Sequence, residues 1–324
     1  VFTISIVIIN FTNMINFNGI YAATVVPMEQ NGKIDKPVLI DHIEQLSNVE
    51  GMTGLLINGH AGENYILDKD EQIEIVKIAR SVVSKETIIV SGLNFEDSHI
   101  AAEVAEKMIN NGADSIMIFP PFSWALTYDE DLIYNHHKLI AEKIKSPIML
   151  YQASINAGSM AYNLKTLERL INIPEVIAIK EGSWETAKYD LNRRLVKRIR
   201  PEVSVMASGD EHLLTCFMIG TEGSLVSLAI IIPEEIIGLY RSIRDNNLEA
   251  AVKYHNIIYP LAKSIYGTRP SGYATARLKT CLKLLGKIPR DKMRNAMEPL
   301  NNIEIENLKK AISLAGLKLN NYNN

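Results

Sequence analysis

Short apolar segments rich in β-branched residues alternate along most of the chain with longer segments whose apolar residues recur at helical spacing. The short segments have the composition of parallel strands that are buried on both faces. Polar residues or glycines follow each of them before the next helical pattern begins. Eight strands are predicted in this way, at residues 19–26, 54–58, 87–91, 115–119, 148–151, 176–180, 203–207 and 223–227.

Helical segments lie between these strands. In the second one, Ile73, Val76 and Ala79 recur at a spacing that places them on one face. Asp68 precedes this pattern as a residue that caps a helix, and the pair Asn111-Gly112 ends the third helix as a C-terminal stop. The predicted helices are 36–49, 68–83, 96–111, 129–144, 163–171, 185–199, 210–219 and 233–244.

The alternation of strands and helices decides the fold class. Eight strand–helix pairs at intervals of about 20 to 35 residues predict a (β/α)₈ TIM barrel of the α/β class. A doubly wound open sheet is the alternative, but its first strand is normally followed by a glycine-rich dinucleotide-binding turn. This chain has Val25-Val26-Pro27-Met28 at that point, which favours the barrel.

The strand pattern ends near residue 245. Three helical patterns follow, at 248–266, 271–285 and 303–314, and no low-complexity linker separates them from the barrel. We therefore predict a barrel over residues 17–245, followed by a small C-terminal helical appendage over residues 246–324 that packs on it.

The first residues need a separate interpretation. Residues 1–9 are strongly apolar, but nine residues are too few to span a bilayer. The basic leading segment and the small-residue cleavage site of a signal peptide are both missing. We predict that residues 1–16 are an extension outside the fold, with Met14 as the natural start and the ordered fold beginning near Phe17. A signal anchor is the alternative.

The composition is that of a globular protein, with 47% hydrophobic and 22% charged residues among 324. The formal net charge of −3 and the spread of Lys and Arg over the predicted helices argue against a nucleic-acid-binding surface. Cys216 and Cys281 both fall in helical patterns, which predicts buried thiols in a reducing compartment. We expect a cytoplasmic protein with neither a nucleic-acid nor a membrane partner.

Two neighbouring strands end in an ionisable side chain. The strand that begins at Val176 ends in Lys180, and the strand before it ends in Tyr151. Because side chains alternate along a strand, Lys180 is predicted to face the barrel interior together with Val176 and Ala178. Tyr151 is predicted to face the same interior.

A lysine in such a place has a specific chemical use. Its amine has an ordinary pKa of about 10.4 and becomes nucleophilic near neutral pH when burial disfavours the ammonium form. It then condenses with a ketone to give an imine, an electron sink for making or breaking an adjacent carbon–carbon bond. Tyr151 would carry the protons. The alternatives are an ion pair between Lys180 and a carboxylate, and a packing role for Tyr151.

The turn over residues 59–63 (Gly-His-Ala-Gly-Glu) follows the second strand, and its closely spaced backbone N–H groups are suited to binding a carboxylate. A plain tight turn is the alternative. The 7 histidines include no His-x-His after the first strand and no His-x₃-His pair on one helix face, so no metal site is predicted. His136 and His137 are predicted to lie on a helix surface.

Several of these segments together resemble one known family. From about Phe17 to its end, the chain is similar to the dihydrodipicolinate synthase / N-acetylneuraminate lyase family of class I aldolases. The combination of motifs, in this order, is specific for the family and less so for any one member. The motifs are Gly19-Ile20-Tyr21-Ala22-Ala23-Thr24, Gly59-x-x-Gly62-Glu63, Gly112-Ala113-Asp114, Leu150-Tyr151, Ile179-Lys180-Glu181, Ser208-Gly209-Asp210 and Gly220-x-x-Gly223-Ser224.

The resemblance implies an aldolase or lyase in which Lys180 forms the Schiff base and Tyr151 relays protons. The turn from Gly59 would hold the carboxylate of pyruvate or another 2-oxo acid, and an aldehyde would be the second small-molecule partner. The family is usually a homotetramer, with a dimer as the alternative here, and it uses no metal or organic cofactor. The substrate-binding residues expected on this basis are Gly59, His60, Ala61, Gly62, Phe122, Asn156, Gly209 and Leu225.

Four positions depart from the family pattern. His60 and Ala61 stand where hydroxyl residues are usual, and Phe122 stands where the synthase has a tyrosine. Asn156 stands where the synthase has an arginine that holds the carboxylate of its second substrate. Losing such a charge-assisted contact costs about 1.5–3 kcal/mol, so we expect an acceptor other than that of the synthase.

Three alternatives remain open at this point. The first is the synthase proper, 4-hydroxy-tetrahydrodipicolinate synthase, which joins pyruvate to aspartate semialdehyde. The second is an aldolase or dehydratase of a sugar-derived 2-oxo-3-deoxy acid. The third is a barrel that serves as a non-catalytic sensor or scaffold, although a binding protein has no need of a buried lysine.

Overall fold

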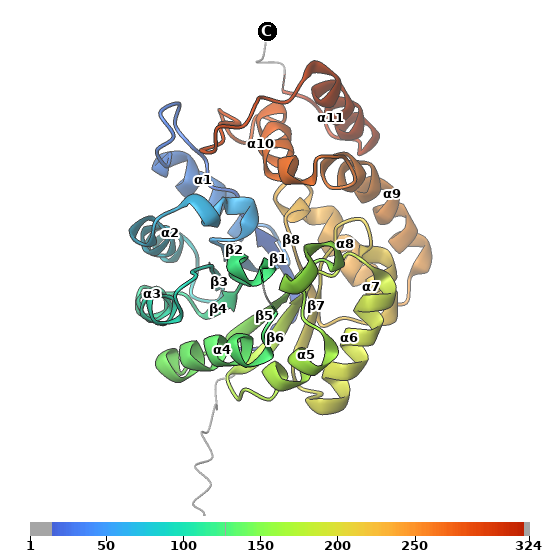
Figure 1. The fold of residues 1–324 in the computed structure, drawn as a ribbon. Coiled ribbons are helices and arrows are strands. Elements are labelled where there is room, and N and C mark those ends of the chain that lie inside the picture. Colours follow the sequence, from blue (N-terminus) through green and yellow to red (C-terminus); the bar gives the residue numbers. More distant parts are fainter. Residues whose placement is uncertain (1–14, 127, 321–324) are drawn as a thin grey trace, which may run out of the picture.

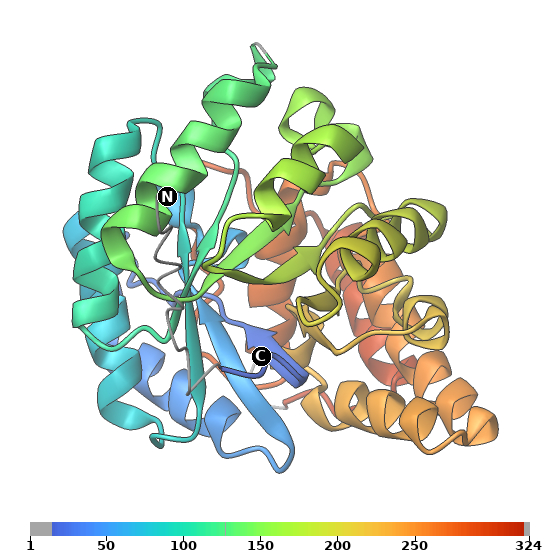
Figure 2. The same cartoon turned by 90° about the horizontal axis from the view of Figure 1, so that it is seen from below.

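The computed structural model describes residues 15–126 and 128–320, which form a closed barrel of parallel strands surrounded by helices. The strands pair in sequence order, and β8 closes the ring on β1 (Figures 1 and 2). The predicted (β/α)₈ barrel is therefore confirmed, and the open sheet is excluded. The strands are β1 Gly19–Ala23, β2 Met52–Ile57, β3 Ile88–Leu93, β4 Ser115–Ile118, β5 Ile148–Gln152, β6 Val176–Glu181, β7 Ser204–Ala207 and β8 Gly223–Val226.

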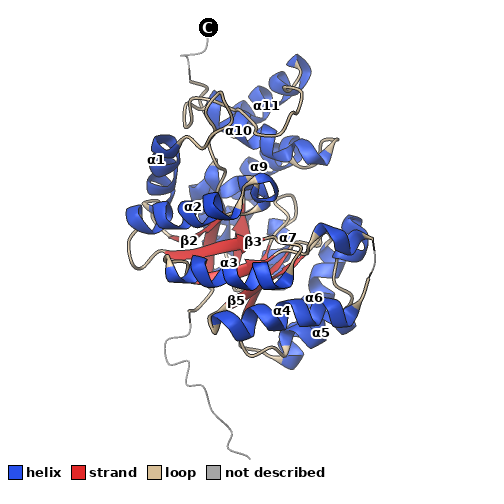
Figure 3. Ribbon diagram, turned by 60° about the vertical axis from the view of Figure 1, so that its left-hand side comes forward, coloured by secondary structure: helices blue, strands red, loops and turns tan. Residues whose placement is uncertain are grey.

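A helix follows each strand and covers the outside of the barrel (Figure 3). These helices are α1 Lys36–Ser47, α2 Lys69–Val82, α3 Ser98–Asn110, α4 Glu130–Ile144, α5 Leu164–Ile171, α6 Thr186–Ile199, α7 Leu213–Ile219 and α8 Pro233–Arg244. The loops carry short 3₁₀ helices: η1 His60–Gly62, η2 Asn64–Ile66, η3 Phe122–Ala125, η4 Ile155–Met160, η5 Leu228–Ile230 and η6 Ser271–Tyr273. Most of the predicted 1–16 extension, including Met14, lies outside the described residues.

Local sequence explains where the helices begin and end. Asp68 caps α2 in a reciprocal capping box with Glu71, as its place before the helical pattern predicted. The chain leaves α3 through Asn111 and then Gly112, which has a φ of 107°, a backbone conformation that favours glycine.

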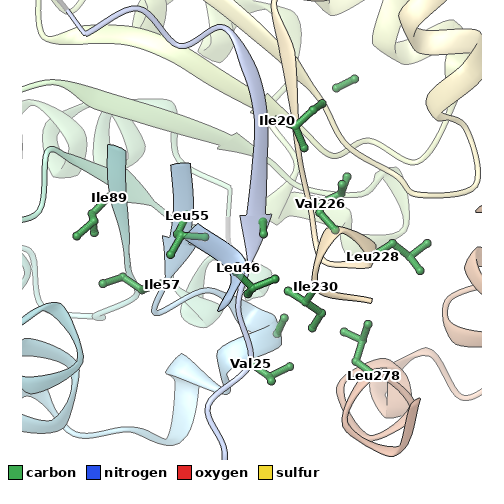
Figure 4. Packing of buried hydrophobic residues seen from close by; sticks show 14 of the residues in the cluster. Ile20, Val25, Leu46, Leu55, Ile57, Ile89, Val226, Leu228, Ile230 and Leu278 are labelled. Carbon is green, nitrogen blue, oxygen red and sulfur yellow. The ribbon is translucent and has the colours of Figure 1, made fainter. Parts of the chain in front are cut away.

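Two apolar layers stabilise the barrel. Leu55 and Ile57 of β2 face outward into the layer between strands and helices (Figure 4). Leu56 between them belongs to the cluster in the barrel interior. This alternation follows from the pleat of a strand whose two faces are both covered. Burying a side chain of this size contributes about 1.5–3 kcal/mol.

The alternation predicted for β6 is wrong at one end. Ala178 lies in the interior cluster as expected, but Val176 lies in the outer layer, and Ile177 packs against the interior cluster. The cause is a register shift between β5 and β6, where the partner of Ile148 is Val176 but the partner of Met149 is Ala178. Such a bulge interrupts the two-residue period.

The predicted surface position of His136 and His137 is also wrong. Both lie on α4 and are buried, and Trp124 of η3 packs edge-on against His136 at 5.5 Å between ring centroids. Ser98 binds Nδ1 of His136 at 2.8 Å, and the hydroxyl of Tyr162 binds Nε2 of His137 at 3.0 Å. Two adjacent histidines read as polar in sequence, but here their neighbours satisfy them.

Three helices follow the barrel, α9 Leu248–Ile265, α10 Ala274–Leu284 and α11 Asn302–Leu314. They lie together beyond α8, and α9 packs against both α8 and α11 (Figure 1). α10 contacts η1, and its Leu278 belongs to the same apolar layer as Val25 and Ile230 (Figure 4). The C-terminal helices therefore reach the loops at one end of the barrel.

Two further observations concern the residues that the structure describes. None of their helices combines the length and apolar character that crossing a membrane requires. Cys216 and Cys281 are both free and buried, as the helical patterns around them predicted.

Candidate active site

A cavity of about 410 Å³ opens at the C-terminal ends of the strands. Its walls come from the strand ends, from the loops after them, and from η6 and α10 of the C-terminal region. Enzymes built on this barrel place their active sites at this end. The polar and aromatic side chains that line it include His60, Tyr65, Tyr151, Lys180, Trp184, Ser208, Asp210, Ser227, Tyr266, Ser271 and Thr275.

Lys180 and Tyr151 meet in this cavity. They are direct partners in the parallel ladder between β6 and β5, so both side chains leave the sheet on the same side. The Nζ atom of Lys180 lies 5.4 Å from the centroid of the Tyr151 ring. Phe119 packs against the same ring at 4.7 Å between centroids and keeps this side of the cavity apolar.

The cavity changes the protonation of Lys180. Burial lowers the pKa of this amine to about 8, while the carboxylate of Asp210 acts in the opposite direction. None of the ion pairs between described residues involves Lys180. With a pKa of about 8, roughly one amine in ten is neutral at pH 7, against fewer than one in a thousand for an ordinary lysine.

Asp210 follows β7 and shares the cavity with Lys180. Burial raises the pKa of this carboxyl to about 6, although Lys180 and the backbone N–H of Leu228 both favour the carboxylate. That N–H donates to Oδ1 of Asp210 at 2.9 Å. Asp210 is therefore the negative charge that faces the lysine.

The hydroxyl of Tyr151 stays protonated near neutral pH. Burial, and then the charge of Glu181, raises the pKa of Tyr151 to about 12. A phenol in this state can donate a hydrogen bond or a proton and can take the proton back from a stronger acid.

His60 lines the same cavity as Lys180. Its ring stacks on Phe119 at 4.0 Å between centroids and meets Tyr151 edge-on at 5.6 Å. Burial, and then the charge of Lys180, lowers the pKa of His60 to about 3, so the imidazole is neutral. Its buried Nε2 has no hydrogen-bond partner among the described residues. A buried polar atom without a partner in a cavity that also contains a lysine is suited to binding a ligand.

The turn over residues 59–63 presents backbone donors next to His60. The N–H groups of Gly62 and Glu63 donate to the carbonyls of Gly59 and His60, at 2.9 and 3.0 Å. Those of His60 and Ala61 stand at the start of the turn, where no earlier carbonyl of the turn can accept them. His60 and Ala61 both line the cavity.

The other expected substrate-binding residues lie at different depths. Phe122 lines the rim of the cavity and is 48% exposed. Gly209 connects Ser208 and Asp210, which both line it. Leu225 is fully buried in the barrel interior, next to Val226 of the cavity wall, whereas Asn156 is exposed in η4 and is not a lining residue.

Sequence patterns did not single out several residues that the cavity contains. Trp184 lies in the loop between β6 and α6, and it packs against Tyr266 at 5.1 Å between ring centroids. Tyr266, Ser271 and Thr275 come from the C-terminal region, whose place over the barrel no local pattern predicts. Asp210 belongs to the Ser208-Gly209-Asp210 motif of the family resemblance, but no role was predicted for it; its position in the loop after β7 is at the end of the barrel where active sites lie. No group of three or more His, Cys, Asp or Glu in residues 15–126 and 128–320 is arranged to hold a metal ion.

The chain is similar in sequence to several known proteins. The sequence matches the Dihydrodipicolinate synthetase family over residues 16–315. A 4-hydroxy-tetrahydrodipicolinate synthase of Thermodesulfovibrio yellowstonii is 27% identical over 304 residues, which cover 93% of this chain and 99% of the relative. An uncharacterized DapA-like lyase of Thermococcus kodakarensis is 29% identical over 247 residues, which cover 76% of this chain and 82% of the relative.

Solved structures show the same fold. A prophage protein of E. coli K12 from the dihydrodipicolinic acid synthase family, solved in complex with pyruvate, superposes with a TM-score of 0.85 at 21% identity, covering 93% of this chain and 99% of that one. The dihydrodipicolinate synthase of Aquifex aeolicus gives a TM-score of 0.84 at 20% identity, with coverage of 94% and 100%. Since the family match spans the whole barrel and the three C-terminal helices, the protein belongs to the dihydrodipicolinate synthetase family.

Proposed function

We propose that the protein is a class I aldolase or lyase in which Lys180 forms an imine with pyruvate or another 2-oxo acid. The observation that carries this proposal is the pairing of Lys180, whose pKa is lowered to about 8, with the protonated Tyr151 in the cavity. A sensor or scaffold would gain nothing from burying an amine, because burial of an unpaired cation costs stability.

The reaction follows from these two side chains. The neutral amine of Lys180 attacks the carbonyl carbon of the 2-oxo acid, and the resulting carbinolamine loses water to give an imine. Tyr151 supplies the proton that the departing hydroxyl needs. The protonated imine then accepts the electron pair released when a bond at the neighbouring carbon breaks, and it returns that pair to an aldehyde in the direction of synthesis.

The substrate carboxylate would bind at the turn over residues 59–63. His60 and Ala61, whose N–H groups begin the turn, both line the cavity, and the buried Nε2 of His60 has no partner among the described residues. A neutral imidazole can donate one hydrogen bond without repelling the ammonium form of Lys180. Gly59 and Gly62 would shape this turn, while Gly209 and Leu225 would support the opposite wall.

The acceptor side favours a neutral, hydroxyl-bearing aldehyde. Apart from Lys180 and the neutral His60, no basic side chain is among the described residues that line the cavity. The polar groups there are Ser208, Asp210, Ser227 and the side chains that η6 and α10 contribute. Hydroxyls and a carboxylate suit sugar hydroxyls better than a second carboxylate. We therefore favour a sugar-derived 2-oxo-3-deoxy acid over the product of the synthase proper.

A trapping experiment tests the imine directly. The protein is incubated with pyruvate, reduced with borohydride and digested, and the modified peptide is identified by mass spectrometry. We expect a reduced adduct at Lys180. If pyruvate and a panel of larger 2-oxo acids all leave Lys180 unmodified, the proposed function is wrong.

The rate of trapping should depend on pH through Lys180. Its folded pKa of about 8 means that the neutral amine increases about tenfold per pH unit below 8 and levels off above it. We expect the initial rate of adduct formation with pyruvate to follow this curve. A rate that keeps rising beyond pH 10 would indicate an ordinary lysine.

An aldehyde panel tests the acceptor. With pyruvate as donor, neutral hydroxyaldehydes are expected to react at least about tenfold faster, by kcat/KM, than aspartate semialdehyde, because a missing charge-assisted contact costs at least one power of ten. Consumption of each aldehyde gives the comparison. Faster turnover of the semialdehyde would favour the synthase reaction and reverse our preference.

The remaining expectations concern context. We propose that the protein is cytoplasmic and forms a homotetramer, or a dimer. Light scattering on the purified protein would measure the number of subunits. A monomeric variant of dihydrodipicolinate synthase is among the structures that share this fold, with a TM-score of 0.84 at 21% identity.

A further inference from the structure

A fully buried ion pair joins the turn over residues 59–63 to the C-terminal region. Glu63, the last residue of the turn, binds Nζ of Lys279 on α10, and both side chains have an exposed fraction of 0%. The other oxygen of Glu63 accepts the backbone N–H of Arg294 at 3.0 Å. Both oxygens of this carboxylate are thus bound by residues from beyond the barrel.

Glu63 occupies an unusual backbone position. Its φ of 57° and ψ of 33° are left-handed, between η1 and η2, a conformation that residues with a side chain rarely adopt. In this conformation its N–H reaches the carbonyl of His60 at 3.0 Å and closes η1. The contacts to Glu63 therefore fix the end of the turn whose start faces the cavity.

Lys279 and Arg294, which bind Glu63, make further contacts of their own. Lys279 also donates to the carbonyl of Lys292 at 3.0 Å. The guanidinium of Arg294 forms two hydrogen bonds to Glu71 of α2, at 2.6 and 2.8 Å, and one to the carbonyl of Gly32 at 2.9 Å. Arg294, which binds Glu63 through its backbone, is therefore itself bound to the barrel through its side chain.

We propose that Lys279 is a positioning residue for substrate binding: through Glu63 it holds the turn over residues 59–63 in the conformation that receives the 2-oxo acid carboxylate. This inference rests on the proposed function. Lys279 is not a cavity-lining residue, while Thr275 and Leu278 of the same helix are. In this proposal, α10 both lines the cavity and fixes the conformation of the adjacent turn.

The burial of the pair makes this role testable. Removing one partner leaves the other charge buried without compensation, whereas removing both charges is often tolerated. Lys279→Met should therefore displace the turn, because the carboxylate of Glu63 must then move toward water. Adding Glu63→Gln removes the stranded charge. The double variant Glu63→Gln/Lys279→Met should recover much of what the single variant loses.

Glu304→Gln is the matched control. Glu304 pairs with Arg277, two residues before Lys279 on α10, at 2.9 Å, and Arg277 is 1% exposed. This variant weakens the packing of α10 on α11. It leaves the contacts of Arg277 with the carbonyls of Ile265, Thr268 and Pro270 in place, and it does not touch the turn.

Two measurements are made on each full-length variant. The first is the pyruvate concentration that gives half-maximal borohydride trapping at Lys180. The second is hydrogen exchange of the peptide that carries residues 59–66, which is independent of any reaction. We expect Lys279→Met to raise the half-maximal pyruvate concentration about ten- to a hundredfold and to speed exchange in this peptide. The maximal trapping rate should change less than about threefold, since the loss lies in binding.

The outcomes separate the proposals. Recovery in the double variant and wild-type behaviour of Glu304→Gln support the positioning role. Equal weakening by Lys279→Met and Glu304→Gln, or unchanged exchange and affinity in Lys279→Met, overturns it. If the wild-type protein traps neither pyruvate nor any of the larger 2-oxo acids, the proposed function fails. In that case, hydrogen exchange of residues 59–66 still shows whether Lys279 fixes the conformation of the turn. Its proposed role in substrate binding is then wrong, because it depends on the proposed function.

Discussion

Replacing Lys180 with methionine is expected to abolish adduct formation with pyruvate and to lower carbon–carbon bond turnover by about a thousandfold or more. Methionine keeps most of the volume of the side chain but has no amine, so no imine can form. Lys180→Arg keeps the positive charge near Asp210 and is expected to be equally inactive, because a guanidinium stays protonated. The pair separates a need for nucleophilicity from a need for charge.

The control for these variants is Lys138→Met. Lys138 lies on α4, is about half exposed and pairs with Glu142 at 3.7 Å. It is not among the residues that line the cavity. Trapping, turnover and the thermal unfolding midpoint are measured for all three variants. A folded Lys180→Met protein with more than a tenth of wild-type turnover would show that the reaction does not pass through an imine at this residue.

Replacing Tyr151 with phenylalanine is expected to lower turnover about a hundred- to ten-thousandfold, the usual contribution of a general acid or base. The ring contacts with Phe119 and His60 should persist, because they depend on the ring and not on the hydroxyl. The fold and the affinity for pyruvate should therefore change little. The loss should appear in the rates of imine formation and of the later proton transfers.

Rapid-mixing trapping distinguishes the steps. Tyr151→Phe is expected to reach the same final amount of adduct as wild type, but more slowly. Phe119→Leu serves as the comparison, since it alters the packing around the ring and leaves the hydroxyl in place. If Tyr151→Phe forms adduct as fast as wild type while Phe119→Leu is slow, Tyr151 has only a packing role.

The order of strands and helices was predictable because short apolar segments typical of buried strands alternate along the chain with segments whose apolar residues recur at helical spacing. The fifth and sixth strands, for example, were expected at 148–151 and 176–180 and are found at Ile148–Gln152 and Val176–Glu181. The side on which Val176 lies was not predictable, since the bulge opposite Ile148 arises from pairing between two strands. Local sequence sets the element, and its neighbour sets the register.

The candidate site divides in the same way. Lys180 and Tyr151 could be singled out because an ionisable residue that ends an apolar strand has no local structural reason to be there. His137 was misjudged for the opposite reason, because its partners, Trp124 and Tyr162, come from loops that the helix pattern does not contain. Tyr266 belongs to a region whose docking on the barrel depends on packing alone.

The Glu63–Lys279 pair has a consequence for how this protein can change over time. The two residues are 216 positions apart in the chain, and each is expected to destabilise the protein when the other is lost. A lineage that loses one charge should therefore lose both, or should pass through intermediates with weakened binding. Among close relatives we expect these two positions to vary together. We also expect recombinants that combine the barrel of one parent with the C-terminal helices of another to be poor enzymes when the two parents differ at this pair.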